Sequence, residues 1–201
     1  YPDFIVIDGN EGGTGAAPLE FMDHLGMPMR DGVNFVHNAL IGINARDRIR
    51  IGCAGKIATA FDMARAMAIG ADWCNSARGF MFALGCIQSL SCHTDRCPTG
   101  VTSQDPIRNR ALVVPHKSER VYNYHHATLH ALAELLGAAG LEHPSELRPI
   151  HFSKRTSTTE VCSFAKLYPA LRPGELLDGT DDPRFRDAWA MARADTFQPT
   201  G

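Results

Sequence analysis

The chain has 201 residues, 44% of them hydrophobic, and its 20 Lys and Arg residues nearly balance 22 Asp and Glu residues. This composition indicates a globular domain with a buried core rather than a disordered segment. Like charges form no block along the chain, so neither nucleic acid nor an anionic membrane is expected as a partner. The longest strongly apolar run, around residues 80–87, is far shorter than the roughly 18 residues of a membrane-spanning helix.

The first half of the sequence predicts three βα units in succession. Strands are expected at 4–7, 48–52 and 71–76, each followed by a helix, at 31–44, 59–70 and 79–87. The first strand is apolar on both faces, as is typical of a parallel strand covered on both sides. Thr59 and Asp62 form a capping-box pattern at the start of the second helix. Alternating strands and helices predict a parallel sheet.

The second half predicts a mainly helical extension. Residues 86–106 are a loop by composition, and apolar spacing then indicates a helix over 122–139. Ser157 with Glu160 makes another capping-box pattern, and Asp182-Pro183 predicts the start of a last helix. The expected division is therefore a barrel part over 1–110 and an extension packing on it over 111–201.

Three βα units are too few for a closed barrel of eight strands, which takes about 200 to 250 residues. The predicted fold class is thus α/β, the C-terminal part of a (β/α)8 TIM barrel. The chain begins at Tyr1 and leads directly into a strand, without a signal-peptide pattern. We expect the missing half-barrel upstream of Tyr1 or in a partner chain.

The turn after the first strand, 8–18, is rich in small residues. Glycine lets backbone N–H groups approach a planar ligand or an anion, although such a turn can also be merely flexible. Glu11 is a candidate acid, base or amine-binding group, because loops at this end of a barrel build active sites. The alternative for Glu11 is a surface carboxylate. The candidate ligand-binding residues beside it are Gly12, Gly13 and Thr14.

Two further small-residue turns follow the second and third strands. Adjacent βα loops of this kind commonly bind phosphate through backbone N–H groups and a helix N-terminus. Two cationic side chains, one in each turn, would add donors to a phosphate, although each could equally be a surface charge. The candidate phosphate-binding residues are Gly55, Lys56, Ser76, Ala77 and Arg78.

Three of the six cysteines, Cys86, Cys92 and Cys97, lie in one loop, and Pro98 follows the last. Cys-Pro is typical of ferredoxin-type ligand runs, and three thiolates without a clear fourth ligand suit a three-iron cluster. Zinc with His93 as a fourth ligand, and disulfide or structural thiols, are the alternatives. The enzyme-like chain favours a reducing, cytoplasmic setting.

Other candidates are weaker. Cys53, Cys74 and Cys162 are interpreted as isolated thiols, and Cys53 at a barrel mouth could be the nucleophile of a dehydrogenase acting on a phosphorylated nucleotide. His126 and His130 share a helix face and could bind a metal, but a packing or solvent role is more typical.

Several segments together resemble the FMN-binding barrel of glutamate synthase over residues 1 to about 140. The likeness is greatest to the shorter FMN-binding glutamate synthase family. Segments that carry it are Glu11-Gly12-Gly13-Thr14-Gly15-Ala16, Gly70-Ala71-Asp72, Ala83-Leu84-Gly85-Cys86, Cys92-His93-Thr94-Asp95-Arg96-Cys97-Pro98-Thr99-Gly100-Val101 and Gln104-Asp105-Pro106.

The resemblance implies an FMN and 3Fe-4S oxidoreductase that reduces 2-iminoglutarate, made from 2-oxoglutarate and ammonia, to glutamate. It implies that Cys86, Cys92 and Cys97 hold the cluster, that the loops at Gly55 and at 77–78 hold the FMN phosphate, and that 12–14 lie near flavin and substrate. An electron donor protein or reductase subunit is an expected partner. The sequences of the turns at 10–11 and 53–56 differ from those of the large multidomain glutamate synthases. This difference concerns which keto acid is the substrate more than which cofactors are bound. A non-redox interaction domain stabilised by zinc or disulfides is the alternative.

Overall fold

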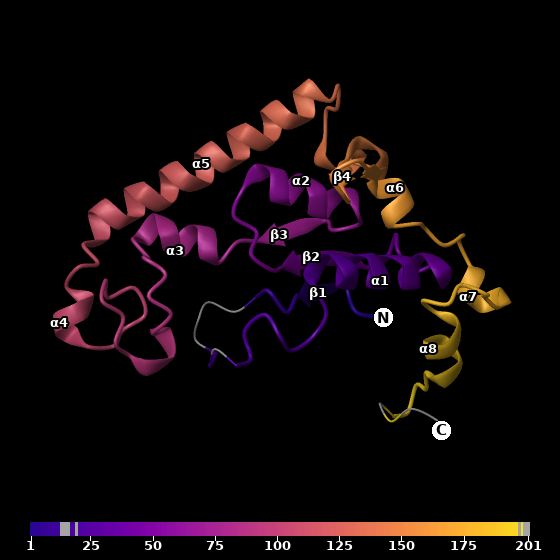
Figure 1. The fold of residues 1–201 in the computed structure, drawn as a ribbon, viewed down its shortest axis with the longest axis horizontal. Helices are drawn as coiled ribbons and strands as arrows, with labels where there is room; N and C mark the ends of the chain where they lie inside the picture. Colours follow the sequence, from indigo (N-terminus) through magenta and orange to yellow (C-terminus); the bar gives the residue numbers. More distant parts are fainter. Residues whose placement is uncertain (13–16, 19, 197, 199–201) are drawn as a thin grey trace.

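The computed structural model describes residues 1–12, 17, 18, 20–196 and 198 (Figure 1). Three strands form a parallel sheet in the order β1-β2-β3, comprising β1 (Phe4–Asp8), β2 (Arg50–Ala54) and β3 (Trp73–Asn75). The predicted parallel sheet is confirmed. Strand β2 begins two residues later than expected because the N–H of Arg48 closes a turn onto the carbonyl of Ala45, 3.1 Å away.

Two helices cover one face of the sheet. Helix α1 (Met29–Gly42) follows β1, and α2 (Ala60–Ala68) follows β2. Buried Ile51, Cys53 and Val33 belong to the core between the sheet and these helices. On the other face Phe4 and Val6 remain 57% and 44% exposed, so the expectation that β1 is covered on both sides is wrong for the described residues.

Helix α2 begins as its sequence predicts. The Thr59 hydroxyl accepts a hydrogen bond from the Asp62 N–H, and the Asp62 carboxylate accepts one from the Thr59 N–H, each at 3.1 Å. This reciprocal pairing satisfies N–H groups that the helix leaves without partners. Helix α3 (Arg78–Leu84) follows β3 and stops at Gly85, whose φ of 108° lies in the left-handed region. It is therefore shorter than expected.

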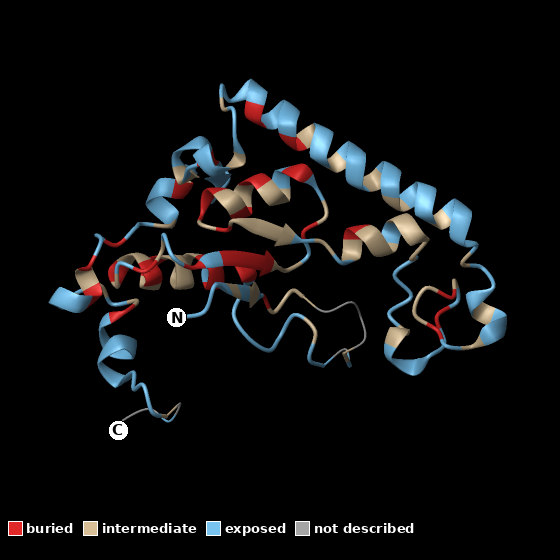
Figure 2. Ribbon diagram, turned by 180° about the vertical axis from the view of Figure 1, so that it is seen from behind, coloured by how far each residue is buried: buried red, intermediate tan, exposed pale blue. Residues whose placement is uncertain are grey.

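A long loop separates α3 from the longest helix. It contains the 3-10 turn η1 (Cys92–Thr94) and the short helix α4 (Pro106–Asn109). Helix α5 (Val114–Ala138) then runs across α3 and α2 with much of its surface exposed (Figures 1 and 2). It begins at 114 rather than at 122 because Pro115 suits the first turn of a helix.

The remaining elements form a mixed extension: 3-10 turns η2 (Pro144–Glu146) and η3 (Pro149–His151), the antiparallel pair β4 (Ser153–Arg155) and β5 (Val161–Ser163), and helices α6 (Phe164–Leu167), α7 (Glu175–Asp178) and α8 (Arg186–Met191). Two helix-start predictions are wrong here. Ser157 accepts a hydrogen bond from the Glu160 N–H at 3.0 Å, but within the turn that joins β4 to β5. Asp182 is bonded to the Arg184 N–H at 2.9 Å, and α8 begins only after that turn.

The extension is attached to α1 through buried contacts. Asn38 is buried, and its Oδ1 accepts a hydrogen bond from the Leu171 N–H at 2.7 Å. Phe35 stacks on Phe185 with ring centroids 4.8 Å apart. Within the described ranges, no helix combines the length and apolar character that crossing a membrane requires.

Candidate functional site

A cavity of about 330 Å³ lies beyond the carboxyl ends of the strands. Loops from all three βα units contribute to it, as does the loop that carries the three clustered cysteines. Four of the side chains or glycines predicted from the sequence meet here, together with four residues that were not predicted. Its lining consists of Glu11, Gly12, Met22, Asp23, His24, Lys56, Arg78 and Leu90.

Glu11 joins the first loop to the start of α1. Its Oε2 accepts a hydrogen bond from the backbone N–H of Met29 at 2.8 Å, at the first residue of that helix. A carboxylate at this position also interacts favourably with the helix dipole. Gly9 and Gly55 pack around the same contact, where an added Cβ would meet the Met29 side chain. The structure thus gives Glu11 a positioning role, and its predicted catalytic role stays a prediction.

Lys56 reaches from the second loop to the first. Its Nζ lies 2.5 Å from Oδ1 of Asp23, in an ion pair between residues that are each about half exposed. The hydrogen bond from Lys56 holds the pKa of the Asp23 carboxyl below its usual value. The ammonium that was predicted to bind a phosphate therefore has a carboxylate partner at the cavity.

Ser76 and a tyrosine from α5 tie the second and third loops together. Ser76 Oγ donates to the carbonyl of Ile57 at 2.7 Å, and Tyr124 Oη donates to the carbonyl of Ala58 at 2.7 Å. The two hydroxyls lie 3.2 Å apart. Gly79 is needed beside them because an added Cβ would overlap the Tyr124 hydroxyl. Ala77 directly precedes α3 in the same loop, and the predicted Gly13 and Thr14 lie outside the described residues.

The segment between α3 and α4, which carries Cys86, Cys92 and Cys97 and is called the cysteine loop below, has an unusual backbone. Gln88, Leu90 and Asp95 adopt φ values of 56°, 56° and 61°, in the left-handed region that non-glycine residues rarely occupy. Such conformations cost energy and cluster at ligand sites and switches. Because Leu90 also lines the cavity, this loop reaches the same site as the βα loops.

Two of the three clustered thiols have hydrogen-bonding neighbours. The Gln88 N–H donates to Cys86 Sγ at 3.5 Å, and the Thr99 hydroxyl lies 3.4 Å from Cys97 Sγ. Burial would raise the pKa of Cys97, but hydrogen bonds from Thr99 and Thr102 lower it to about 6. All six cysteines are free thiols, so disulfides do not staple this loop.

The described part of the chain contains no group of three or more His, Cys, Asp or Glu side chains placed to hold a metal ion. The assignment of Cys86, Cys92 and Cys97 as metal ligands therefore stays a prediction. His126 and His130 form no such group either, and His130 Nδ1 lies 3.7 Å from Glu134 on exposed helix surface.

Cys53 and Cys74 are neighbours rather than isolated thiols. They are paired in register on β2 and β3, with their sulfurs 3.6 Å apart. The contact with Cys74 lowers the pKa of Cys53 although burial opposes it, and Cys53 is fully buried. The interpretation of Cys53 as a nucleophile at the mouth of a site is therefore wrong.

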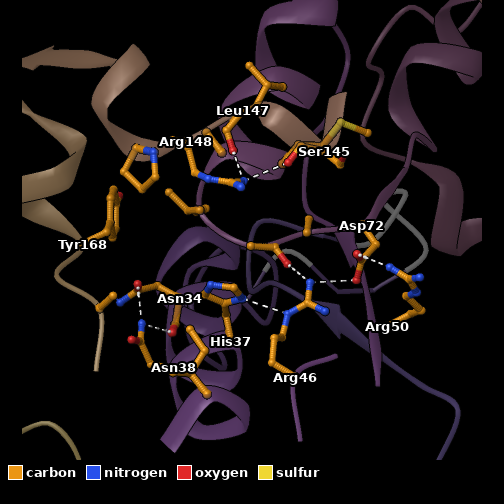
Figure 3. Close-up of a pocket in the computed structure, with 18 of the residues that line it drawn as sticks. Asn34, His37, Asn38, Arg46, Arg50, Asp72, Ser145, Leu147, Arg148 and Tyr168 are labelled. Carbon is orange, nitrogen blue, oxygen red and sulfur yellow. Dashed lines mark hydrogen bonds and ion pairs between the residues drawn. The ribbon is translucent and has the colours of Figure 1, made fainter. Parts of the chain in front are cut away.

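A second, larger cleft of about 960 Å³ lies at the amino ends of the strands, between α1, α2 and the extension (Figure 3). Arg46 makes several polar contacts in this cleft. Its guanidinium donates hydrogen bonds to His37 Nδ1 at 2.9 Å and to Asp72 at 2.8 Å, and also to the carbonyls of Ile49 and Gly70. Burial and Arg46 lower the pKa of His37 to about 4. Because these donors are satisfied within the chain, we assign the network a structural role.

Four residues of the cavity were missed from the sequence: Met22, Asp23, His24 and Leu90. Met22, Asp23 and His24 lie in the connection between β1 and α1, which carried no motif beyond its glycine-rich start. The ion pair of Asp23 with Lys56 joins residues 33 positions apart in the sequence, and no local sequence pattern predicts such a contact. Tyr124, whose hydroxyl lies 3.2 Å from that of Ser76, is 48 residues from it in the sequence.

Parallel βα units define an α/β protein, and here a cavity lined by two cationic side chains lies at the carboxyl ends of the strands. Residues 1–142 match the family model described as the conserved region in glutamate synthase. The chain therefore belongs to the glutamate synthase family.

Named relatives agree with this assignment. A glutamate synthase large subunit-like protein of Bacillus subtilis is 44% identical over 154 residues, which are 77% of this chain and 28% of that protein. The archaeal glutamate synthase [NADPH] of Methanocaldococcus jannaschii is 38% identical over 73% of this chain and 29% of its own length. Ferredoxin-dependent glutamate synthase 2 of Synechocystis is 37% identical over 69% of this chain and 9% of its length. The chain spans less than a third of these relatives.

Proposed function

We propose that this chain is the C-terminal half of an FMN-binding (β/α)8 barrel in a glutamate synthase-type oxidoreductase. Among the described residues β1 and β3 each pair only with β2, so each leaves an edge open for a further strand. The exposed Phe4 and Val6 would face the interior that the upstream strands complete. Residues 1–110 would be the barrel part and 111–201 an extension packed on it.

The cavity at the strand ends suits the phosphate end of FMN. Lys56 and Arg78 bring two cationic side chains to it, and Gly55, Ser76 and Ala77 lie in the loops that carry them. At about 330 Å³ it is at the lower end of ligand pockets, so it would hold one end of the cofactor. Gly12 would lie toward the flavin ring and substrate; Gly13 and Thr14, predicted for the same role, are outside the described residues.

The cysteine loop suits an iron-sulfur cluster by the chemistry of its donors. Cys86, Cys92 and Cys97 are free thiols within one loop, and soft thiolate ligands are those that a 3Fe-4S cluster requires. Hydrogen bonds to sulfur, such as those at Cys86 and Cys97, tune cluster potentials in iron-sulfur proteins. The strained backbone at 88, 90 and 95 is consistent with a loop shaped around a ligand.

When bound, FMN would supply the hydride for reduction of an imine of 2-oxoglutarate, or a similar keto acid, with electrons entering through the cluster. Within this chain, Lys56 and Arg78 would hold the phosphate end, and Ser76 with Tyr124 would keep the two loops in register. Glu11 Oε2 accepts a hydrogen bond from the Met29 N–H, and the other oxygen of this carboxylate would exchange a proton with substrate nitrogen. The electron donor would be a ferredoxin-like protein or a reductase subunit, and six free thiols support a cytoplasmic setting.

One observation carries the proposal: Lys56 and Arg78 of the phosphate loops and Leu90 of the cysteine loop line the same cavity. The test is glutamate formation by the full-length protein with 2-oxoglutarate, ammonia and a chemically reduced viologen. We expect glutamate in proportion to bound FMN, and a large loss of activity in Arg78→Met. An FMN-loaded protein that oxidises the reduced viologen but makes neither glutamate from 2-oxoglutarate nor the matching amino acid from related keto acids would reject the assignment.

A further inference from the structure

The ion pair between Asp23 and Lys56 lies in the cavity where the phosphate of FMN is proposed to bind. Its atoms are 2.5 Å apart, and both residues line the cavity beside Arg78. Both also adopt left-handed backbone conformations, with φ of 65° at Asp23 and 49° at Lys56. Neither residue is glycine, so the chain holds two unfavourable conformations at the two ends of one contact.

Backbone bonds fix Asp23 at this place. The N–H of Asp23 donates to the carbonyl of Asn10 at 3.1 Å, and the N–H of Asn10 donates to the carbonyl of Met27 at 2.9 Å. The connection between β1 and α1 therefore folds back on itself and presents the Asp23 carboxylate to Lys56. The carboxylate is placed by the loop rather than by a chance side-chain rotamer.

A carboxylate and a phosphate next to one ammonium repel each other. The pair is about half exposed, so its attraction is weak and water can replace one partner. An anionic ligand that reaches Lys56 must therefore displace Asp23 or bind against its charge. In either case the carboxylate reduces the affinity for the anion.

We propose that Asp23 is an exchangeable counter-ion of Lys56, which the phosphate of an incoming flavin nucleotide replaces. The inference rests on the proposed FMN site and adds to it a residue that sets the affinity for the phosphate group. Asp23 is a positioning residue that acts through Lys56.

The experiment compares the affinities of the flavin-free full-length protein for FMN and for riboflavin, measured by flavin fluorescence quenching. Asp23→Asn should tighten FMN binding about two- to fivefold, the range expected from an exposed ion pair, and leave riboflavin binding unchanged. Asp23→Glu should restore the wild-type affinity. Glu20→Gln is the matched control, because Glu20 is an exposed carboxylate in the same connection that forms no ion pair among the described residues.

Combining Asp23→Asn with Lys56→Met tests the route of the effect. In the Lys56→Met background Asp23→Asn should no longer change FMN affinity, because the ammonium for which Asp23 and the phosphate compete is absent. An unchanged FMN affinity in Asp23→Asn, or an equal effect with and without Lys56, would overturn the inference while leaving the FMN site intact. A wild-type protein that binds FMN no better than riboflavin would overturn both the inference and the proposed phosphate site.

Discussion

Glu11 and Met29, 18 residues apart, are joined by a 2.8 Å hydrogen bond from the Met29 backbone N–H to the Glu11 carboxylate. This contact places the first βα loop against the start of α1. It also orients the Glu11 carboxylate, which is one of two carboxylates from that loop in the cavity lining, the other being that of Asp23. A structural and a catalytic role for Glu11 make different predictions.

Glu11→Ala removes the bond to Met29 and should lower the free energy of unfolding by about 0.5–2 kcal/mol, as loss of a helix cap does. Glu11→Gln keeps an acceptor oxygen and should cost only a few tenths of a kcal/mol to about 1 kcal/mol, through the lost charge near the helix N-terminus. If Glu11 transfers a proton, Glu11→Gln should nevertheless lower turnover by about 10²-fold or more. Urea unfolding and steady-state rates separate the two roles, and near-wild-type turnover in Glu11→Gln would remove Glu11 from the chemistry.

Gly79 should not tolerate a side chain. Gly79→Ala would push a methyl group against the Tyr124 hydroxyl and disturb its bond to the Ala58 carbonyl. We expect a destabilisation of about 1–3 kcal/mol, typical of overpacking, together with weaker FMN binding. Gly137→Ala is the control: an added Cβ there meets nothing within 4 Å, and the change should stabilise α5 by about 0.5–1 kcal/mol. Thermal unfolding of both variants measures this, and equal effects would contradict the packing argument.

His37 makes stability depend on pH. Its folded pKa of about 4 lies below the ordinary value of 6.5, so the unfolded chain binds a proton that the folded chain refuses between these values. His37 therefore leaves the free energy of unfolding unchanged above about pH 6.5. As the pH falls toward 4, this free energy decreases by on the order of 2–3 kcal/mol, at about 1.4 kcal/mol per pH unit. His37 faces Arg46 in the cleft at the amino ends of the strands (Figure 3).

Unfolding free energies measured at pH 7.5 and pH 5 test this for the wild type and for His37→Asn. The variant should lose most of the pH slope. His130→Asn should retain it, because His130 is exposed on α5. A slope that persists in His37→Asn would assign the effect to other groups.

Asn38 anchors the extension to α1. Asn38→Ala would leave the buried Leu171 N–H without its 2.7 Å acceptor and should cost about 1–3 kcal/mol. Limited proteolysis should then cut the extension faster than α1 and the sheet. Asn34→Ala is a gentler control, since it removes one acceptor of Asn38 but keeps the bond to Leu171. Unchanged proteolysis in Asn38→Ala would show that other contacts hold the extension.

Local sequence signals predicted the fold where one face or one turn decides the structure. The Thr59 and Asp62 capping box, the parallel strands and the helix α5 were all readable from spacing. Of the four leucines at helical spacing in α5, Leu132 and Leu136 are buried, whereas Leu129 and Leu135 are exposed. The Ser157 and Glu160 pattern failed because the same side-chain-to-backbone bond also closes a tight turn. Here it closes the turn that joins β4 to its antiparallel partner β5.

For the site, the sequence predicted the loops but not the contacts between them. Glu11, Gly12, Lys56 and Arg78 meet in one cavity because parallel strands end at the same edge. Asp23 was missed because its partner is 33 residues away. The pairing of Cys53 with Cys74 depends on strand register, which single-strand patterns do not reveal.

The most direct test of the account is the iron, zinc and flavin content of the purified full-length protein, by elemental analysis and absorbance. We expect about three irons, one FMN and no stoichiometric zinc per chain, with iron lost in Cys92→Ser and retained in Cys162→Ser. A colourless protein with one zinc per chain, or an iron content unaffected by Cys92→Ser, would contradict the proposal that Cys86, Cys92 and Cys97 hold a cluster beside a flavin.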